Sequence, residues 1–255
     1  LCRPAPASAI AVPWSVLDPE RVVLHVFTSG STGEPVLIPK RLRQLCAEIC
    51  ALDAEFAARI GRGCVHAMVT HQHMYGLPFR VLWPLAAGRP FAARRLVFPE
   101  DMLAALASSP DAVLIASPAH LKRLPEHLDW PSVCGQVAAV FSSGGPLPDE
   151  SVPLCARLLG RAPIEIYGSS ETGAIAWRQR GSDLDAPWQP LPGMVVRVEG
   201  ERLDMRSSWL DSDGVQEGAD RVAARGGGFA LLGRGDRVVK IEEKRVSLQA
   251  IEREL

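Results

Sequence analysis

The sequence predicts an α/β fold, in which a mostly parallel sheet with flanking helices is followed by a smaller antiparallel or barrel-like segment. Two observations support this prediction. Short apolar segments alternate with helical patterns from residue 21 to residue 173, and this alternation is typical of βαβ units. From Ala174 onward, short strand patterns joined by Gly, Pro and Asp turns replace it, which indicates antiparallel pairing.

Apolar residues that recur every three or four positions predict the helices. The clearest helix spans residues 41–60, with Cys46 and Cys50 expected as buried thiols on its apolar face and with Glu48 on a polar face. Weaker patterns predict three shorter helices, at residues 77–87, 100–108 and 149–159. The first of these three contains Pro78 and Pro84, which remove backbone donors from a helix.

Short apolar runs between turn residues predict the strands. Five belong to the first part of the chain, at residues 21–27, 64–70, 112–116, 137–141 and 163–166. Four more are expected after Ala174, at residues 175–177, 194–198, 202–205 and 229–232. Residues 207–228 are polar and rich in glycine, and they are predicted to form a long surface loop.

Each strand of the first group ends in a loop rich in Gly, Ser, Thr or His. These loops follow Phe27, Thr70, Ala116, Phe141 and Ile166. In open α/β sheets, ligands bind outside the carboxyl ends of the strands, so the pattern predicts a ligand site at one edge of the sheet. The first loop, residues 28–35, is suited to hold phosphate through its amides and hydroxyl groups, and a ligand-free Ser/Gly turn is the alternative.

Composition excludes several classes of function. A formal net charge of −1 over 255 residues provides no broad basic field, so neither nucleic acid nor an anionic membrane surface is an expected partner. No apolar run approaches the roughly 20 residues that a membrane span needs. Six cysteines without a C-x-x-C pair favour reduced thiols over a zinc site and predict a cytoplasmic location. The chain lacks an initiator Met and stops inside an apparent helix, so we expect a fragment at both ends.

Several nucleotide and hydrolase motifs are missing from the sequence. It contains no G-x-x-x-x-G-K-[ST], no G-x-G-x-x-G after a strand, no H-E-x-x-H and no G-x-S-x-G. Kinase, dehydrogenase, zinc protease and α/β-hydrolase functions are therefore not indicated.

Three segments together resemble the adenylate-forming superfamily, whose members are AMP-binding enzymes similar to acyl-CoA synthetases. Residues 28–35, Thr-Ser-Gly-Ser-Thr-Gly-Glu-Pro, resemble its phosphate loop. Residues 167–173, Tyr-Gly-Ser-Ser-Glu-Thr-Gly, resemble its adenine- and magnesium-binding segment. Residues 233–240, Gly-Arg-Gly-Asp-Arg-Val-Val-Lys, resemble its interdomain hinge. The resemblance implies that residues 1–235 form the large ATP- and acyl-binding domain and that residues 236–255 begin a smaller lid domain.

The resemblance also implies a nucleotide site for ATP. The residues that would surround the β- and γ-phosphates are Thr28, Ser29, Gly30, Ser31, Thr32 and Gly33. The residues that would line the adenine and the phosphate next to it are Ser143, Gly144, Gly145, Tyr167, Gly168, Ser169 and Ser170. Asp220 and Arg234 resemble the pair that binds the ribose.

Four residues carry the chemistry that the resemblance implies. Glu171 would bind Mg²⁺, and Thr172 would donate to the α-phosphate that the substrate carboxylate attacks. His73 resembles the histidine that lies between the acid and the adenylate, with a merely hydrogen-bonded histidine as the alternative. The family has Lys directly after the loop proline, whereas this chain has Val36, and whether Lys40 takes over the phosphate contact stays open.

The implied reaction joins a carboxylic acid to AMP with release of pyrophosphate, before transfer to the thiol of coenzyme A or of an acyl carrier protein. Residues 240–248 most resemble bacterial synthetases of aryl-polyene pigment pathways, which makes an aryl or unsaturated acid the expected substrate. Glu243 stands where the family has a glycine beside the thiol channel, so the acceptor stays open. Apolar candidates for the acyl pocket are Met74, Phe79, Ile175 and Trp177, and for each of them a place in the ordinary core is the alternative. The alternatives are a nucleotide-binding relative without turnover and a purely structural α/β domain.

Overall fold

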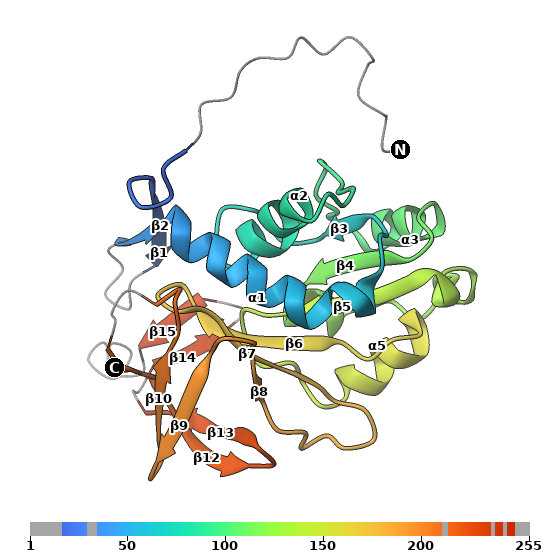
Figure 1. Ribbon diagram of the computed structural model, residues 1–255. Coiled ribbons are helices and arrows are strands. Elements are labelled where there is room, and N and C mark those ends of the chain that lie inside the picture. The colour runs from blue at the N-terminus through green and yellow to red at the C-terminus, as the bar shows by residue number, and fades with distance from the viewer. Residues whose placement is uncertain (1–16, 30–34, 211–213, 236–237, 242–243, 248–255) are drawn as a thin grey trace.

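The computed structural model describes residues 17–29, 35–210, 214–235, 238–241 and 244–247 (Figure 1). Its centre is a six-stranded sheet whose strands pair in sequence order. They are β3 (Val65–Ala67), β4 (Ala112–Ala116), β5 (Val137–Ser142), β6 (Ile164–Ser169), β7 (Gly173–Gln179) and β8 (Gln189–Pro190). The pairs from β3 to β6 are parallel, and β7 and β8 add to the edge in antiparallel pairing.

Helices cover both faces of this sheet, and the alternation of side chains along β4 shows how. Val113 and Ile115 join a core cluster with α1 (Leu42–Ile60), η1 (Leu77–Leu82) and α2 (Trp83–Ala86). Ala112, Leu114 and Ala116 join a second cluster on the opposite face. That cluster includes residues of α3 (Pro99–Ala107), α4 (Pro118–Leu121), η2 (Trp130–Ser132) and α5 (Ser151–Leu159), and η3 (Cys134–Gln136) precedes β5. Because both of its faces are buried, β4 is apolar throughout.

Antiparallel elements precede and follow the main sheet. The hairpin of β1 (Val23–Ser29) and β2 (Pro35–Arg41) lies beside the start of α1 in Figure 1. A three-stranded sheet contains β9 (Val195–Glu199), β10 (Arg202–Arg206) and β11 (Gln216–Glu217), and two further hairpins contain β12 (Asp220–Arg225) with β13 (Gly228–Arg234) and β14 (Val238–Ile241) with β15 (Lys244–Ser247). Trp188 and Phe229 exchange backbone hydrogen bonds of 2.8 and 3.1 Å, which connect β13 to the strand next to β7.

This architecture confirms the predicted fold class. The helices expected at 41–60, 100–108 and 149–159 are α1, α3 and α5, and the strand expected at 112–116 is β4. The helix expected at 77–87 forms with a different hydrogen-bond pattern, because its first half is the π-helical η1 with Pro78 in its first turn. Among the described residues, no helix is both long and apolar enough to cross a membrane.

The prediction of a long surface loop at residues 207–228 was wrong. The segment contains β11 and β12, and Trp209, Leu210 and Val222 are buried within it. Trp209 Nε1 donates a hydrogen bond of 3.1 Å to the carbonyl oxygen of Ala174. The apolar part of the indole is therefore held by burial and its N–H group by this hydrogen bond. The strand β12 escaped prediction because Val222 is its single buried hydrophobic side chain and glycines surround it.

The expectation that residues 21–27 join the parallel sheet was also wrong. This strand, β1, pairs with β2 in an antiparallel hairpin instead. Pro35 and Pro39 concealed β2 in the sequence, since proline normally interrupts a strand. In a two-stranded hairpin each strand has an outer edge, and prolines four residues apart place their nitrogen atoms on the same side of the strand.

The faces of α1 differ from the prediction. Cys46 and Cys50, expected to be buried, are exposed thiols. Gln44 and Glu48, one helical turn apart, are buried instead. Both lie against chain segments far away in the sequence, so the polar residues of this helix face inward where they find hydrogen-bond partners.

A cluster of aromatic rings joins α1 and the helical segment after β3 to the sheet. Phe141 on β5 lies 5.1 Å from Phe56, 5.4 Å from Phe79 and 5.8 Å from Trp83, measured between ring centroids. All four residues are almost fully buried. The ring of Phe141 therefore touches both helical elements that cover this face of the sheet.

We expect Phe141→Ala to lower the free energy of unfolding by about 3–5 kcal/mol, because it removes buried apolar surface and leaves a cavity at this junction. Phe98→Ala is the matched control, since Phe98 is 63% exposed and its loss should change stability by about 0.5 kcal/mol or less. Urea unfolding followed by circular dichroism measures both. Equal midpoints for the two variants would contradict the assigned role of the ring.

Candidate active site

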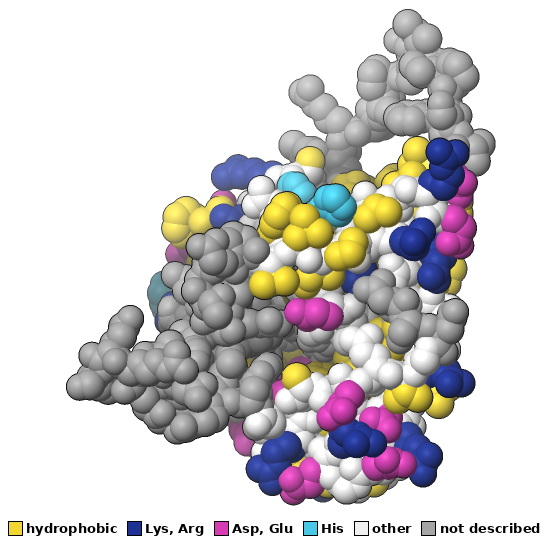
Figure 2. Space-filling model, turned by 90° about the vertical axis from the view of Figure 1, so that its left-hand side faces the viewer, with side chains coloured by type: hydrophobic (Ala, Val, Ile, Leu, Met, Phe, Trp, Pro, Cys, Tyr) yellow, Lys and Arg dark blue, Asp and Glu magenta, His cyan; other side chains and the backbone are white. Residues whose placement is uncertain are grey.

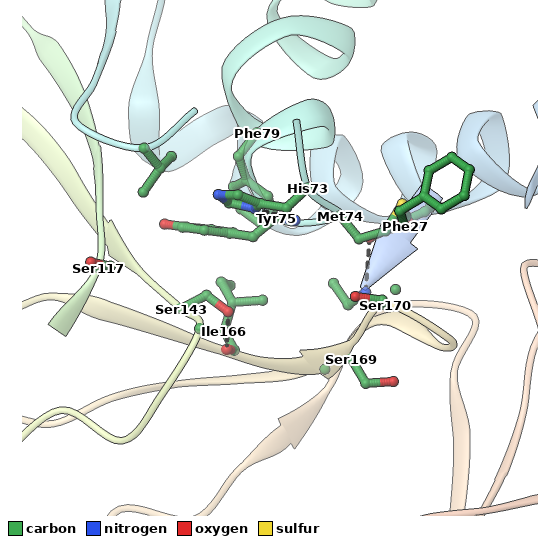
Figure 3. A pocket seen from close by; sticks show the side chains of 16 residues that line it. Phe27, His73, Met74, Tyr75, Phe79, Ser117, Ser143, Ile166, Ser169 and Ser170 are labelled. Carbon is green, nitrogen blue, oxygen red and sulfur yellow. Dashed lines mark hydrogen bonds between the residues drawn. The ribbon is translucent and has the colours of Figure 1, made fainter. Parts of the chain in front are cut away.

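A pocket of about 320 Å³ lies at the carboxyl edge of the parallel strands. The parallel strands β3 to β6 all contribute to its lining, through Val69, Ser117, Ser143 and Ser169, which lie at or beyond their carboxyl ends. Phe27 from β1 also lines it, as Figure 3 shows. The loops predicted to converge at one sheet edge therefore do converge, and the hairpin reaches the same pocket from outside the sheet.

One wall of the pocket contains the segment after β3. Met74, Tyr75 and Phe79 line it beside His73, opposite Ile166 and Ser143 (Figure 3). Histidine side chains lie beside hydrophobic ones on the face that Figure 2 shows. This wall is mainly apolar and aromatic, which suits an apolar ligand group.

The ring of His73 has a defined orientation at this wall. Its Nδ1 accepts hydrogen bonds from the backbone N–H groups of Tyr75, at 3.3 Å, and Gly76, at 3.1 Å. A nitrogen that accepts carries no proton, so the neutral ring has its proton on Nε2. His73 is thus both a pocket residue and a hydrogen-bonded one, and the two alternatives for it are not exclusive.

A tight turn joins β6 to β7 and forms the facing wall. Ser169 N donates to Thr172 Oγ1 at 3.0 Å, and Thr172 N donates to Ser169 Oγ at 3.2 Å. Thr172 Oγ1 also donates to the carbonyl oxygen of Gly173 at 2.9 Å. The buried hydroxyl of Thr172 therefore stabilises the turn, with the half-buried Glu171 at its tip. Contact of Thr172 with a phosphate stays a prediction.

Lys40 approaches the same turn from the hairpin. The side chain is 2% exposed, and its Nζ donates to the carbonyl oxygen of Glu171. The structure thus places Lys40 against the backbone of the residue expected to bind Mg²⁺, while its contact with a phosphate stays a prediction. Val36, which replaces the lysine that the family has after the loop proline, is 50% exposed.

Sequence analysis missed Glu48, which lines the pocket from α1. Glu48 is 2% exposed, and its carboxyl group accepts a hydrogen bond of 2.8 Å from the backbone N–H of Ala174. Burial raises the pKa of Glu48 to about 7, although the Ala174 hydrogen bond and the charge of Lys40 both oppose this shift. The available signal was the spacing of Gln44 and Glu48, which places two polar groups on one side of a mostly apolar helix.

The residues expected around adenine and ribose also come together. Tyr167 OH donates to Asp220 Oδ2 at 2.7 Å, and the Tyr167 ring packs against Trp188 and Phe229 with centroids 5.6 and 5.7 Å away. Asp220 lies directly opposite Arg234 in the register of β12 and β13. Residues far apart in the sequence therefore meet here, and their contact with adenine and ribose stays a prediction.

The predicted residues differ in how they relate to the pocket. Those that line it are His73, Ser143, Gly144, Gly168, Ser169 and Ser170. Those that the structure describes but that are not among its lining residues are Lys40, Gly145, Tyr167, Glu171, Thr172 and Asp220. Gly30, Ser31, Thr32 and Gly33 lie outside the described residues, and the side chains of Thr28, Ser29 and Arg234 do as well.

Two of the four apolar candidates for an acyl pocket do line this one. Met74 and Phe79 are lining residues. Trp177 is not, because its ring packs 5.5 Å from Phe56 and under the guanidinium of Arg59. Ile175 is 2% exposed within the main core cluster. The expectation for Trp177 and Ile175 was therefore wrong.

The residues that the structure describes at this site do not form a metal site by themselves. Within the part of the chain that the structure describes, no group of three or more His, Cys, Asp or Glu side chains is arranged to hold a metal ion. Mg²⁺ commonly binds through one or two carboxylates together with substrate phosphates. The single carboxylate of Glu171 fits that mode, and Glu171 remains the predicted magnesium ligand.

Comparison with known proteins identifies relatives of this chain. The family model described as AMP-binding enzyme matches residues 5–206. A 4-coumarate–CoA ligase of Cereibacter sphaeroides is 30% identical over 235 residues, which are 88% of this chain and 51% of that protein. The chain therefore spans about half the length of this curated relative.

Solved structures share the fold. The amide bond synthetase McbA from Marinactinospora thermotolerans superposes with a TM-score of 0.78 at 19% identity, over 97% of this chain and 56% of that one. A malonyl-CoA ligase in a ternary product complex with methylmalonyl-CoA and AMP superposes with a TM-score of 0.76 at 22% identity, over 95% of this chain and 59% of that one.

The raised pKa of Glu48 predicts how stability changes with pH. Below pH 4.5 the carboxyl group is protonated in the folded and unfolded chain alike, and above pH 7 the folded chain buries a charge. The stability that the neutral carboxyl contributes is therefore lost as the pH rises from 4.5 through about 7.

Glu48→Gln cannot ionise, so the variant should gain stability over the wild type across this interval, by on the order of 3 kcal/mol. Urea unfolding at pH 4.5 and pH 8 measures the difference. Glu150→Gln, at an exposed position, is the control and should follow the wild type. If the free energy of unfolding of Glu48→Gln differed from that of the wild type by the same amount at both pH values, the raised pKa of Glu48 would be contradicted.

Proposed function

We propose, from the premise that this chain belongs to the AMP-binding enzyme family, that it activates a carboxylic acid with ATP to give an acyl-adenylate and pyrophosphate. One observation carries the proposal. The hairpin that contains the predicted phosphate loop, the His73 segment and the Glu171 turn converge around a single pocket, although they are distant in the sequence. The structural alternative, an α/β domain without a ligand, offers no reason for this convergence.

The site residues divide the work of adenylation. A carboxylate oxygen of the acid attacks the α-phosphorus of ATP, and the bond to the β-phosphate breaks as pyrophosphate leaves. The amides and hydroxyl groups of residues 28–33 would stabilise the negative charge on the leaving phosphates. Glu171 would hold the Mg²⁺ that neutralises charge there, and His73 would present its Nε2–H toward the acid. Most of the catalysis is thus positioning and electrostatic stabilisation.

The nucleotide would bind next to the pocket, near the loop after β5 and the residues Tyr167 and Asp220. Ser143 Oγ donates to the carbonyl oxygen of Ile166 at 2.8 Å, which holds the loop after β5 against β6. Gly144 lines the pocket with a φ of +97°, a conformation that favours glycine, so the backbone is accessible there. Tyr167 and Asp220 are connected by their hydrogen bond, and Asp220 would bind the ribose together with Arg234.

An aryl or unsaturated acid is the substrate class that we propose. The pocket lining includes Met74, Tyr75, Phe79 and Val69, and an apolar and aromatic lining of this kind suits a flat apolar acyl group. The similarity to a 4-coumarate–CoA ligase supports this class, since coumarate is an unsaturated aryl acid.

The acceptor of the activated acyl group would be the thiol of coenzyme A or of a carrier protein. The CoA ligases among the relatives support coenzyme A. Glu243, which bears on this choice, lies outside the described residues. We further propose that residues 1–235 form the large domain and residues 236–255 begin the lid. The second candidate function, nucleotide binding without turnover, is favoured by Val36 at the position of the expected lysine.

Exchange of labelled pyrophosphate into ATP tests the proposal. The natural polypeptide that contains this chain is incubated with ATP and a panel of aryl, unsaturated, fatty and amino acids. We expect exchange that depends on an aryl or unsaturated acid and that falls by about 100-fold or more in Glu171→Ala, because a charge-stabilising group is lost.

Glu150→Ala is the control, since Glu150 is an exposed acid that follows β5, and its exchange rate should equal that of the wild type. Nucleotide binding without exchange for any acid would refute the proposal and support the relative without turnover.

A further inference from the structure

We propose that Lys40 and Glu48 form a buried clamp that holds the Glu171–Ala174 turn in the position that adenylation needs. The inference rests on the proposed function, and it assigns both residues as positioning residues. They act through the backbone of the turn, one at each end of its four residues.

The first end is held from the hairpin. Lys40 Nζ donates to the carbonyl oxygen of Glu171, and the lysine side chain is 2% exposed. Lys40 belongs to β2, so this contact joins the second strand of the hairpin to the Glu171 turn. A displacement of the hairpin would therefore displace the carboxylate expected to bind Mg²⁺.

The second end is held from α1. Glu48 Oε1 accepts the backbone N–H of Ala174 at 2.8 Å. Gly173 packs directly on the same carboxyl group, since a Cβ atom at this glycine would lie 2.6 Å from Glu48 Oε2. The φ of Gly173 is +68°, so both its conformation and its close contact require glycine.

Two further side chains support the Glu48 end. Trp209 Nε1 donates to the carbonyl oxygen of Ala174 at 3.1 Å, so both backbone groups of Ala174 are bound by side chains. Gln44 Nε2 in turn donates to the carbonyl oxygen of Trp209 at 3.1 Å. Gln44 and Glu48 are one turn apart on α1, and both connect this helix to the Ala174 end of the turn, Glu48 directly and Gln44 through Trp209.

Burial argues that the clamp serves more than stability. A lysine and a glutamate removed from water both carry a desolvation cost, and apolar side chains of similar volume often stabilise a fold as well or better. Both groups here bind backbone atoms of the one turn that contains Glu171 and Thr172. A misplacement of about 1 Å in such a turn can slow a reaction by about 100-fold.

Four variants test the clamp in the pyrophosphate exchange assay. Glu48→Leu and Lys40→Met remove the hydrogen bonds and keep apolar volume. Each should lower kcat by about 100-fold, with the KM of the acid changed by less than about 3-fold, and Lys40→Met should also require more Mg²⁺ for half-maximal activity. Glu48→Gln retains an oxygen that accepts from Ala174 N, and it should recover activity to within about 10-fold of the wild type. Lys40→Arg should recover part of the activity of Lys40→Met.

Glu55→Leu is the matched control. It places the same substitution on α1 at a residue that binds Arg59 at the surface, and it should behave as the wild type. Glu48→Leu with an unchanged kcat and a raised KM for the acid would overturn the clamp in favour of a direct contact with the acyl group. Equal losses in Glu48→Gln and Glu48→Leu would overturn it as well.

Amide hydrogen exchange separates failure of the clamp from failure of the proposed function. Residues 172–174 should exchange faster in Glu48→Leu and in Lys40→Met than in Glu55→Leu, whether or not any acid is activated. Unchanged protection of these amides in a folded variant, as judged by its melting temperature, would overturn the clamp. If the amides exchange faster in the variants but the wild type activates no acid, the proposed function is refuted. The role of Lys40 and Glu48 in holding the turn would still be supported.

Discussion

The parallel register of β3 to β6 is the constraint on which the site depends. Successive parallel strands begin at one edge of a sheet and end at the other, because a helical crossover returns the chain between them. Ile115 pairs with Phe141, and Phe141 with Ile164, so the loops that follow these strands leave the sheet at the same edge. Polar loop residues that are weak signals one by one therefore become neighbours around a single pocket.

The turn between β6 and β7 connects this edge to the rest of the molecule. A tight turn leaves backbone donors and acceptors that regular strand pairing does not satisfy, and buried groups of this kind need partners. Ser169 and Thr172 supply some of them from within the turn. Lys40, Glu48 and Trp209 supply others from the hairpin, from α1 and from the segment after β10. The position of Glu171 is thus set jointly by three parts of the chain.

Elements with a strong and uniform pattern of apolar residues were predicted well. The strand at 112–116 is buried on both faces, so every side chain is apolar and its limits are visible in the sequence. The strands β2 and β12 were missed, because a hairpin strand with few buried side chains accepts proline, glycine and polar residues. Of the site, the loops and their convergence were foreseen from their place after strands, whereas Trp177 and Ile175 were assigned to the pocket only because they are apolar and near the turn.

By itself the sequence determined the fold class, the central elements of the main sheet and the segments that are predicted to carry the chemistry. These follow from local periodicity and from motifs whose residues are contiguous. Only the tertiary structure decided which polar side chains of α1 are buried. Each of Cys46 and Cys50 lies two positions from Glu48, which is about 200° around the helix axis, so the thiols and the carboxyl group are on nearly opposite faces. Hydrophobicity alone favoured burial of the thiols, and the folded chain buries Glu48 instead. The deciding partner of Glu48 is Ala174 N–H, 126 residues away in the sequence, and such a contact exists only once the chain has folded.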